Sequence, residues 1–114
     1  YFGLCMAGGA MHHEAIDVDE DHTAGFSSGA VRFGFRRWFV LGVVPMTLAH
    51  LWLLQQIDRF AVLMLSAFAV YIVLLVVCTV RSIDHRRAMV FRMYCRIVYG
   101  LAGAVYLLWR LVTL

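Results

Sequence analysis

The chain has 114 residues, of which 63% are hydrophobic and 15% charged, and its mean hydropathy is +0.81. These values exclude an ordinary soluble domain and indicate an integral membrane protein, with room for about three spans and no separate catalytic domain. The formal net charge of +3 comes from arginines alone, because the chain has no lysine. These arginines flank apolar segments, so anionic lipid explains them better than nucleic acid, and we expect no nucleic-acid partner.

Residues 1–37 are predicted to form a polar N-terminal tail and an interfacial segment, and their apolar opening, YFGLCMAGGAM, is either the tail of a targeting sequence or a short buried segment. Within them, HHEAIDVDEDHTAG at 12–25 is acidic, and we expect it to be solvated or bound to a partner. Its alternating aspartates resemble the start of a calcium loop, but His22 stands where such a loop needs glycine. The nearby histidines fit no standard zinc spacing, so we predict no metal site. Because the chain starts at Tyr1 and not at Met, we expect a processed form or a fragment.

The first predicted span covers residues 38–54, WFVLGVVPMTLAHLWLL. Its two tryptophans would lie at the two headgroup levels, as aromatic side chains do at membrane interfaces. Gly42 and Pro45 predict a kink, which neighbouring helices would have to cover. The link that follows, QQIDR, is too short for anything but a tight turn. We therefore expect the first two spans to form an antiparallel hairpin.

The second predicted span covers residues 60–80, FAVLMLSAFAVYIVLLVVCTV, and has no charged residue along its whole length. As a helix it would reach roughly 30 Å, about the thickness of the hydrocarbon core of a bilayer. It lacks the polar face that a helix in a soluble protein needs. This segment is the strongest indication that the chain crosses a membrane.

Residues 81–96, RSIDHRRAMVFRMYCR, are predicted to form either a short interfacial helix or a helical extension of the last span. The third span covers residues 97–114, so that residues 38–114 form one three-helix transmembrane domain. Small side chains that would let a neighbouring helix approach closely occur in this span at Gly100, Gly103 and Ala104. The predicted fold class is an all-α membrane protein with three transmembrane helices and a polar N-terminal tail.

Three spans place the N-terminal flank and the 81–96 segment on the same side of the membrane. That side holds Arg32, Arg36, Arg37, Arg81, Arg86, Arg87, Arg92 and Arg96. The other side holds Arg59 and Arg110. By the positive-inside rule, the arginine-rich side faces the mitochondrial matrix, or the cytoplasm of a bacterium.

The arginines between the second and third spans have two explanations: they set the topology, or they also bind an anionic lipid such as cardiolipin. If the segment is helical, Arg92 and Arg96 fall on one face. The predicted lipid-binding residues are Arg81, Arg86, Arg87, Arg92 and Arg96.

The spans lack the groups that transport or catalysis would need. None contains Asp, Glu or Lys, so ion-coupled transport by this chain alone is not expected. Ser66 and Thr79 have no histidine nearby in the sequence, and we predict a non-catalytic subunit. The cysteines lack the spacing of a metal site or a disulfide framework and are predicted to be apolar fillers at Cys5, Cys78 and Cys95.

Two histidines are the first candidates for a haem or quinone contact. His50 lies within one turn of the far end of the first span, and His85 lies in the arginine-rich segment. A hydrogen bond from His50 to a headgroup or a neighbouring residue is the alternative. No cofactor is predicted to be held by this chain alone.

Three features follow one another along the chain: an arginine flank leading into LGVVP at 41–45, a second span starting just after Asp58, and a third span ending in AVYLLWRL at 104–111. Together they resemble the small membrane-anchor subunit of succinate dehydrogenase, complex II, over residues 32–114. The resemblance implies a mitochondrial inner-membrane location and an anchor role for the flavin and iron–sulfur subunits. It also implies a share in a ubiquinone site and a haem b. The second span of that family usually supplies an axial histidine, and residues 60–80 contain none.

The sequence therefore predicts a non-catalytic anchor or structural subunit of a mitochondrial respiratory-chain complex, with the complex II anchor as first choice. The first alternative is an accessory lipid-binding subunit of ATP synthase or of another respiratory complex. The second is a haem- or pigment-binding membrane subunit that uses His50. Expected partners are other subunits of a large membrane complex and anionic lipids, with cardiolipin as a structural lipid and a shared ubiquinone or haem b.

Overall fold

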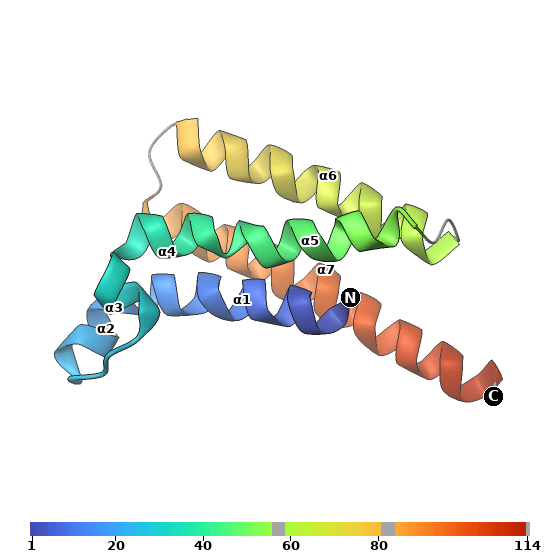
Figure 1. Ribbon diagram of the computed structural model, residues 1–114, viewed down its shortest axis with the longest axis horizontal. Helices are drawn as coiled ribbons and strands as arrows, with labels where there is room; N and C mark the ends of the chain where they lie inside the picture. Colours follow the sequence, from blue (N-terminus) through green and yellow to red (C-terminus); the bar gives the residue numbers. More distant parts are fainter. Residues whose placement is uncertain (56–58, 81–83, 114) are drawn as a thin grey trace.

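The computed structural model describes residues 1–55, 59–80 and 84–113, and all regular structure within them is helical. The predicted all-α class is confirmed for this part of the chain. The longer helices build four rods, which are α1 (Phe2–Ile16), α4 (Phe35–Leu41) with α5 (Val43–Leu53), α6 (Arg59–Val80) and α7 (His85–Thr113). Each rod runs antiparallel to the next one in the chain (Figure 1). Two short helices join α1 to α4 at one end of the bundle, α2 (Val18–Thr23) and α3 (Gly29–Phe33).

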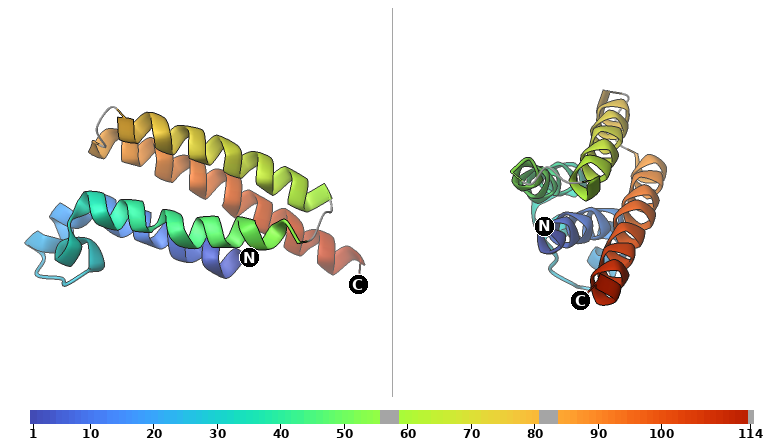
Figure 2. Two further views of the ribbon diagram at one scale, coloured as in Figure 1. Left: turned by 45° about the horizontal axis from the view of Figure 1, so that its top comes forward. Right: turned by 90° about the vertical axis from the view of Figure 1, so that its right-hand side faces the viewer.

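The four rods form a bundle in which α1 and α6 lie diagonally opposite each other (Figure 2). Helix α1 packs against α5, α4 and α7, and α6 packs against α5 and α7. The largest fully buried side chains include Phe39, Met46, Met64, Tyr71 and Phe91, which come from all the rods except α1. Helix α1 contributes a buried histidine, His12, to the same core.

The prediction of a polar tail is wrong for residues 2–16, which form helix α1. Residues 2–16 are helical and inside the bundle, because Cys5, Gly8, His12 and Ala15 recur at helical spacing and form a buried stripe of mostly small side chains. The solvated acidic segment begins only after this helix, where α2 has no buried residue. The segment that joins α1 to the first predicted span is therefore shorter than the predicted tail of residues 1–37, and it lies at one end of the bundle (Figure 1).

The first predicted span is divided into α4 and α5, which meet at Gly42. Pro45 has no N–H to offer the carbonyl of Leu41, so the helical hydrogen-bond pattern is weakest in this turn. The interruption therefore lies where the sequence placed a kink. Helix α5 then runs antiparallel to α6, as expected for a hairpin, while residues 56–58 of the link lie outside the described residues.

Glycines bring α1 and α5 into close contact. A Cβ atom at Gly8 would lie 2.7 Å from the carbonyl oxygen of Gly42 and 2.6 Å from Cγ of Met46. A Cβ atom at Gly42 would lie 2.8 Å from Cε1 of His12. Only hydrogen at these positions lets the two backbones approach so closely, which is the usual way in which helices pack in membranes.

Helices α6 and α7 are the two described helices that are long and apolar enough to cross a membrane, over Arg59–Val77 and Arg86–Thr113. Helix α7 is continuous, so the 85–96 part of the arginine-rich segment extends the last predicted span and is not a separate helix. The hydroxyl of Tyr94 on α7 donates to the carbonyl of Ala67 on α6 at 2.8 Å, which joins the two helices.

Candidate functional site

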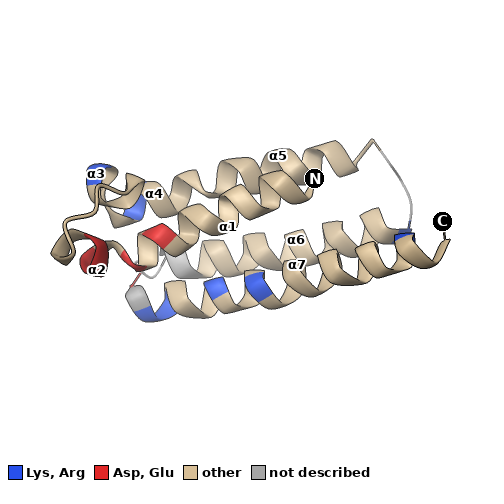
Figure 3. Ribbon diagram, turned by 90° about the horizontal axis from the view of Figure 1, so that it is seen from below, with Lys and Arg blue, Asp and Glu red and all other residues tan. Residues whose placement is uncertain are grey.

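The arginines gather at one end of the bundle, as the predicted topology requires. Figure 3 shows the basic residues on α3, α4 and the first half of α7 at the end where the acidic α2 also lies. These are Arg32, Arg36, Arg37, Arg86, Arg87, Arg92 and Arg96. Arg59 and Arg110 lie on the opposite end, at the start of α6 and the end of α7. Arg81 lies outside the described residues.

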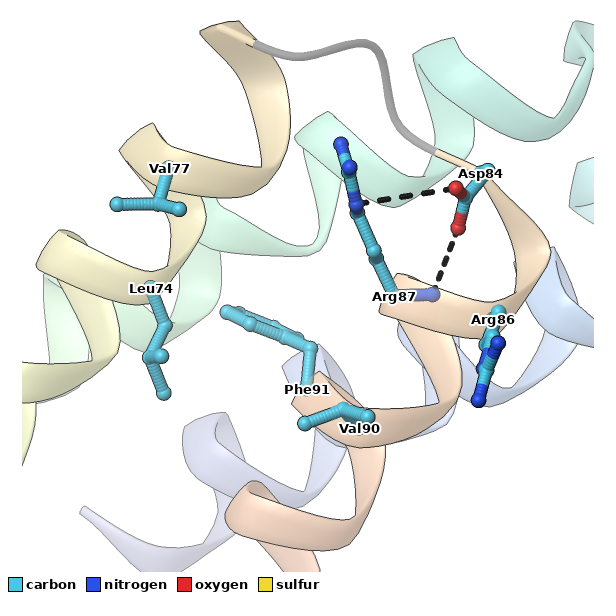
Figure 4. Close-up of a pocket in the computed structure, with 7 residues that line it drawn as sticks. All are labelled: Leu74, Val77, Asp84, Arg86, Arg87, Val90 and Phe91. Atoms are coloured by element: carbon cyan, nitrogen blue, oxygen red, sulfur yellow. Dashed lines mark hydrogen bonds and ion pairs between the residues drawn. The ribbon is translucent and has the colours of Figure 1, made fainter.

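A cavity of about 450 Å³ opens between the end of α6 and the start of α7 (Figure 4). Its apolar lining comes from both helices, and Leu74 and Phe91 point toward each other across it. Asp84 caps α7 by accepting the backbone N–H of Arg87 at 2.8 Å, and its other carboxylate oxygen lies 3.7 Å from Nε of Arg87. The side chain of Arg86 points away from Asp84 (Figure 4).

A second cavity, of about 330 Å³, lies between α1 and α7. We call it the α1–α7 cavity; it is lined by Phe2, Cys5, Met6, Gly9, Ala10, His12, His13, Met46, Arg92, Cys95, Arg96, Tyr99 and Gly100. The lining is mostly apolar, and its charged groups are the arginines of α7. Arg92 and Arg96 therefore share a face of α7, as the sequence predicted for a helix.

Arg92 is held by two residues from the end of α1. Its Nη2 lies 2.9 Å from Nε2 of His13, and its Nη1 lies 3.5 Å from Oδ1 of Asp17. Because a guanidinium can only donate, Nε2 of His13 must accept, and Nδ1–H of the same ring donates to Oδ2 of Asp17 at 2.5 Å. Arg92 is thus paired, whereas Arg96 is exposed and has no ion-pair partner in the described part of the chain.

The predicted lipid-binding arginines are therefore separated by the structure into two places. Arg86 and Arg87 line the cavity between α6 and α7, and Arg92 and Arg96 line the α1–α7 cavity. This arrangement does not bring all of them to a single lipid headgroup. Lipid binding itself stays a prediction.

His50 is buried and both of its ring nitrogens are occupied. Its Nδ1–H donates to the carbonyl of Met46 at 2.6 Å, so Nε2 accepts from the hydroxyl of Tyr1 at 3.0 Å. The ring also stacks on Phe68, with the centroids 4.1 Å apart. An axial haem ligand needs a free nitrogen lone pair facing open space, and His50, at 1% exposure, lines neither cavity.

His50 as it lies therefore does not fit the haem b that the resemblance implies, nor a direct quinone contact. The alternative interpretation, a hydrogen bond to a neighbouring residue, agrees with the structure. The side chain of His85 lies outside what the structure describes, and its haem or quinone contact stays a prediction.

The sequence did not predict a polar pair that crosses the core. Nε2 of His12 on α1 forms a 3.0 Å hydrogen bond with the hydroxyl of Tyr71 on α6, between the two diagonally opposite helices. Nearby, the hydroxyl of Tyr99 on α7 is buried and has no hydrogen-bond partner among the described residues. The available signal for His12 was its place in a stripe of small side chains at helical spacing. For Tyr71 and Tyr99 nothing in the local sequence distinguished them from lipid-facing tyrosines.

The predicted packing face of α7 is not used for close packing within this chain. Gly100 has no atom within 4 Å of a Cβ position, and Ala104 is exposed. Gly103 lies beside the ring of Phe2, whose Cε1 would be 3.4 Å from an added Cβ. A partner helix on this face stays a prediction, and close helix contacts inside the chain are made by Gly8 and Gly42 instead.

The fold and the charge distribution define an all-helical chain with two long apolar helices and a basic end. No family model, curated protein or solved structure matches the chain.

Proposed function

We propose that this chain is a non-catalytic integral membrane subunit of a larger complex, and that it binds anionic lipid at its arginine-rich end. In this proposal α4–α5, α6 and α7 are the three spans, and α1 packs beside them. The arginine-rich end lies at the matrix or cytoplasmic surface, because positive charge is retained on that side.

The observation that carries the proposal is the outer surface of α6 and α7. Large apolar side chains remain exposed along both helices, among them Val62, Leu63, Val73, Leu101 and Leu108. A soluble monomer rarely leaves so extended an apolar surface in water, whereas a bilayer or neighbouring helices would cover it. The described charged residues of these helices are Arg59 at the start of α6, Arg86, Arg87, Arg92 and Arg96 in the first half of α7, and Arg110 near its end, so the long stretches between them are apolar.

The histidines support a structural role. His12 is bonded to Tyr71, His13 to Arg92, and His50 to Met46 and Tyr1. Each of these bonds joins parts of the bundle or fixes the ring within it. None of these rings is paired with a serine, threonine or cysteine nucleophile among the described residues.

The particular complex that we propose first is succinate dehydrogenase in the mitochondrial inner membrane, on the resemblance in residues 32–114. The order of α4–α5, α6 and α7 is compatible with a three-span anchor of that kind. The same order of helices is also compatible with an accessory lipid-binding subunit of ATP synthase or another respiratory complex, and with a subunit of a bacterial inner membrane. The choice among them depends on what the chain assembles with.

Purification of the full-length tagged protein from its native membranes in a mild detergent tests the proposal. We expect the chain to resist carbonate extraction and to migrate in a large complex with tightly bound anionic phospholipid. Succinate–quinone reductase activity in that particle would support the anchor assignment, and ATPase activity would support the alternative. A Soret band that is lost in His50→Leu would instead favour a haem-binding subunit. Release by carbonate as a soluble monomer would overturn the proposal altogether.

A further inference from the structure

We propose that the α1–α7 cavity holds one acyl chain of an anionic phospholipid, and that Arg96 binds the phosphate of this lipid. The inference rests on the proposed function, because an acyl chain enters this cavity from a surrounding bilayer. It goes further in naming the cavity, the ligand class and the arginine that selects it.

The dimensions and lining of the cavity suit a hydrocarbon chain. Its volume of about 330 Å³ is in the range of ligand sites in proteins. Gly9 on α1 and Gly100 on α7 line it from two sides, and each has open space where a Cβ atom would lie. Phe2 and Met6 supply flexible or aromatic apolar surface from α1. Glycines on both sides therefore leave room for a guest instead of allowing the two helices to close on each other.

The charge at the cavity selects an anion. Arg92 already pairs with Asp17 and bonds to His13, so Arg96 provides the positive charge that no described acidic residue neutralises. A guanidinium matches the phosphate group in both charge and geometry.

The position of Arg96 along α7 also favours a lipid phosphate. From Arg96 to Arg110 the helix advances only about 21 Å at 1.5 Å per residue, whereas the hydrocarbon core is about 30 Å thick. At least one of these guanidinium groups must therefore extend along the helix or draw a phosphate inward. Arg96 adjoins a cavity that would accept the acyl chain of that same lipid.

Tyr99 lies beside Arg96 in the wall of this cavity. It lines the cavity three residues beyond Arg96, hence on a neighbouring part of the same helix face, and its buried hydroxyl lacks a partner in the described residues. The hydroxyl is covered by protein atoms and the ring packs against His50, so the charge of Arg96 selects the ligand, and a neutral quinone would leave Arg96 unpaired.

The test uses the full-length protein in phosphatidylcholine nanodiscs that contain a minority of phosphatidylglycerol with a photoactivatable group on its acyl chain. Cross-linked residues are identified by mass spectrometry. We expect cross-links in the α1–α7 cavity, at Met6 and Cys95. Gly9→Leu should abolish them by filling the cavity, whereas Gly3→Leu, on the same helix and with equally open space, lies outside the cavity and should leave them unchanged.

The charge is tested separately. Arg96→Gln should lower the affinity for phosphatidylglycerol about tenfold, the effect of losing one charge-assisted hydrogen bond, and Arg110→Gln should not. Gly100→Leu fills the cavity from α7 and replaces Gly9→Leu should that variant fail to fold.

Cross-links confined to other surfaces would overturn the inference, as would equal labelling in all variants. Displacement by a ubiquinone analogue but not by unlabelled phosphatidylglycerol would likewise overturn it. Failure of the protein to enter nanodiscs, seen as failure to float with lipid, would contradict the proposed function itself. Insertion with cross-links outside the cavity would contradict only the present inference.

Discussion

Replacing Gly8 with alanine probes the contact that fixes α1 in the bundle. The new methyl group would lie 2.6 Å from Cγ of Met46 and 2.7 Å from the carbonyl oxygen of Gly42. The side chain of Met46 can move, but the Gly42 carbonyl belongs to the backbone, so α1 and α5 must separate. Overpacking of this kind costs about 1–3 kcal/mol of folding free energy.

Gly3→Ala is the matched control, because Gly3 is in the same helix and has no atom within 4 Å of its Cβ position. Both substitutions gain about 0.5–1 kcal/mol from the higher helix propensity of alanine. That gain cancels in the comparison, so Gly8→Ala should be less stable than Gly3→Ala by about 1–3 kcal/mol. The measurement is equilibrium unfolding of both variants by SDS in the same detergent micelles, followed by circular dichroism. Equal midpoints and slopes would refute the close packing of α1 on α5.

Three further predictions concern single side chains. Tyr71→Phe leaves Nε2 of His12 buried without its partner, so it should lower the free energy of unfolding by about 1–3 kcal/mol in the same measurement. Tyr106→Phe should lower it by less, because the hydroxyl of Tyr106 has no hydrogen bond within the described residues. Arg92→Gln removes the bonds to His13 and Asp17, so it should lower the free energy of unfolding by about 1 kcal/mol in dilute buffer and by less in high salt. Arg36→Gln is the control and should leave the free energy of unfolding unchanged in both buffers. A stability loss from Arg92→Gln that is unaffected by salt would contradict the ion pair. Ala104 lies on an exposed face of α7, so Ala104→Leu should leave the unfolding midpoint unchanged but weaken co-purification with the parent complex. Undiminished co-purification would argue against a partner helix on this face.

The parts of the fold that depend on the order of residues along the chain could be predicted from the sequence. The length and uninterrupted apolar character of residues 60–80 are local properties, and they predicted α6. The separation of Arg59 and Arg110 from the other described arginines is also fixed once the helices alternate in direction. The shared face of Arg92 and Arg96 required only helical geometry.

The parts that depend on contacts between distant residues could not be predicted in this way. Polar residues after the apolar start of α1 indicated a solvated tail, but His12 finds Tyr71 and Glu14 accepts the indole N–H of Trp38 at 2.9 Å. These partners, far along the chain, make burial of the polar half of α1 favourable. The division of the basic residues between two cavities also required the positions of α1 and α6 on either side of α7.

The most direct test of the central claim is the side of the membrane on which the arginines lie. Single cysteines are introduced as Arg36→Cys, Arg86→Cys, Arg59→Cys and Arg110→Cys in a chain without its native cysteines, and sealed vesicles of known orientation are treated with an impermeant maleimide. We predict that positions 36 and 86 are labelled from one side of the membrane and that positions 59 and 110 are labelled only from the other. Labelling of positions 59 and 86 from the same side would contradict the three-span topology.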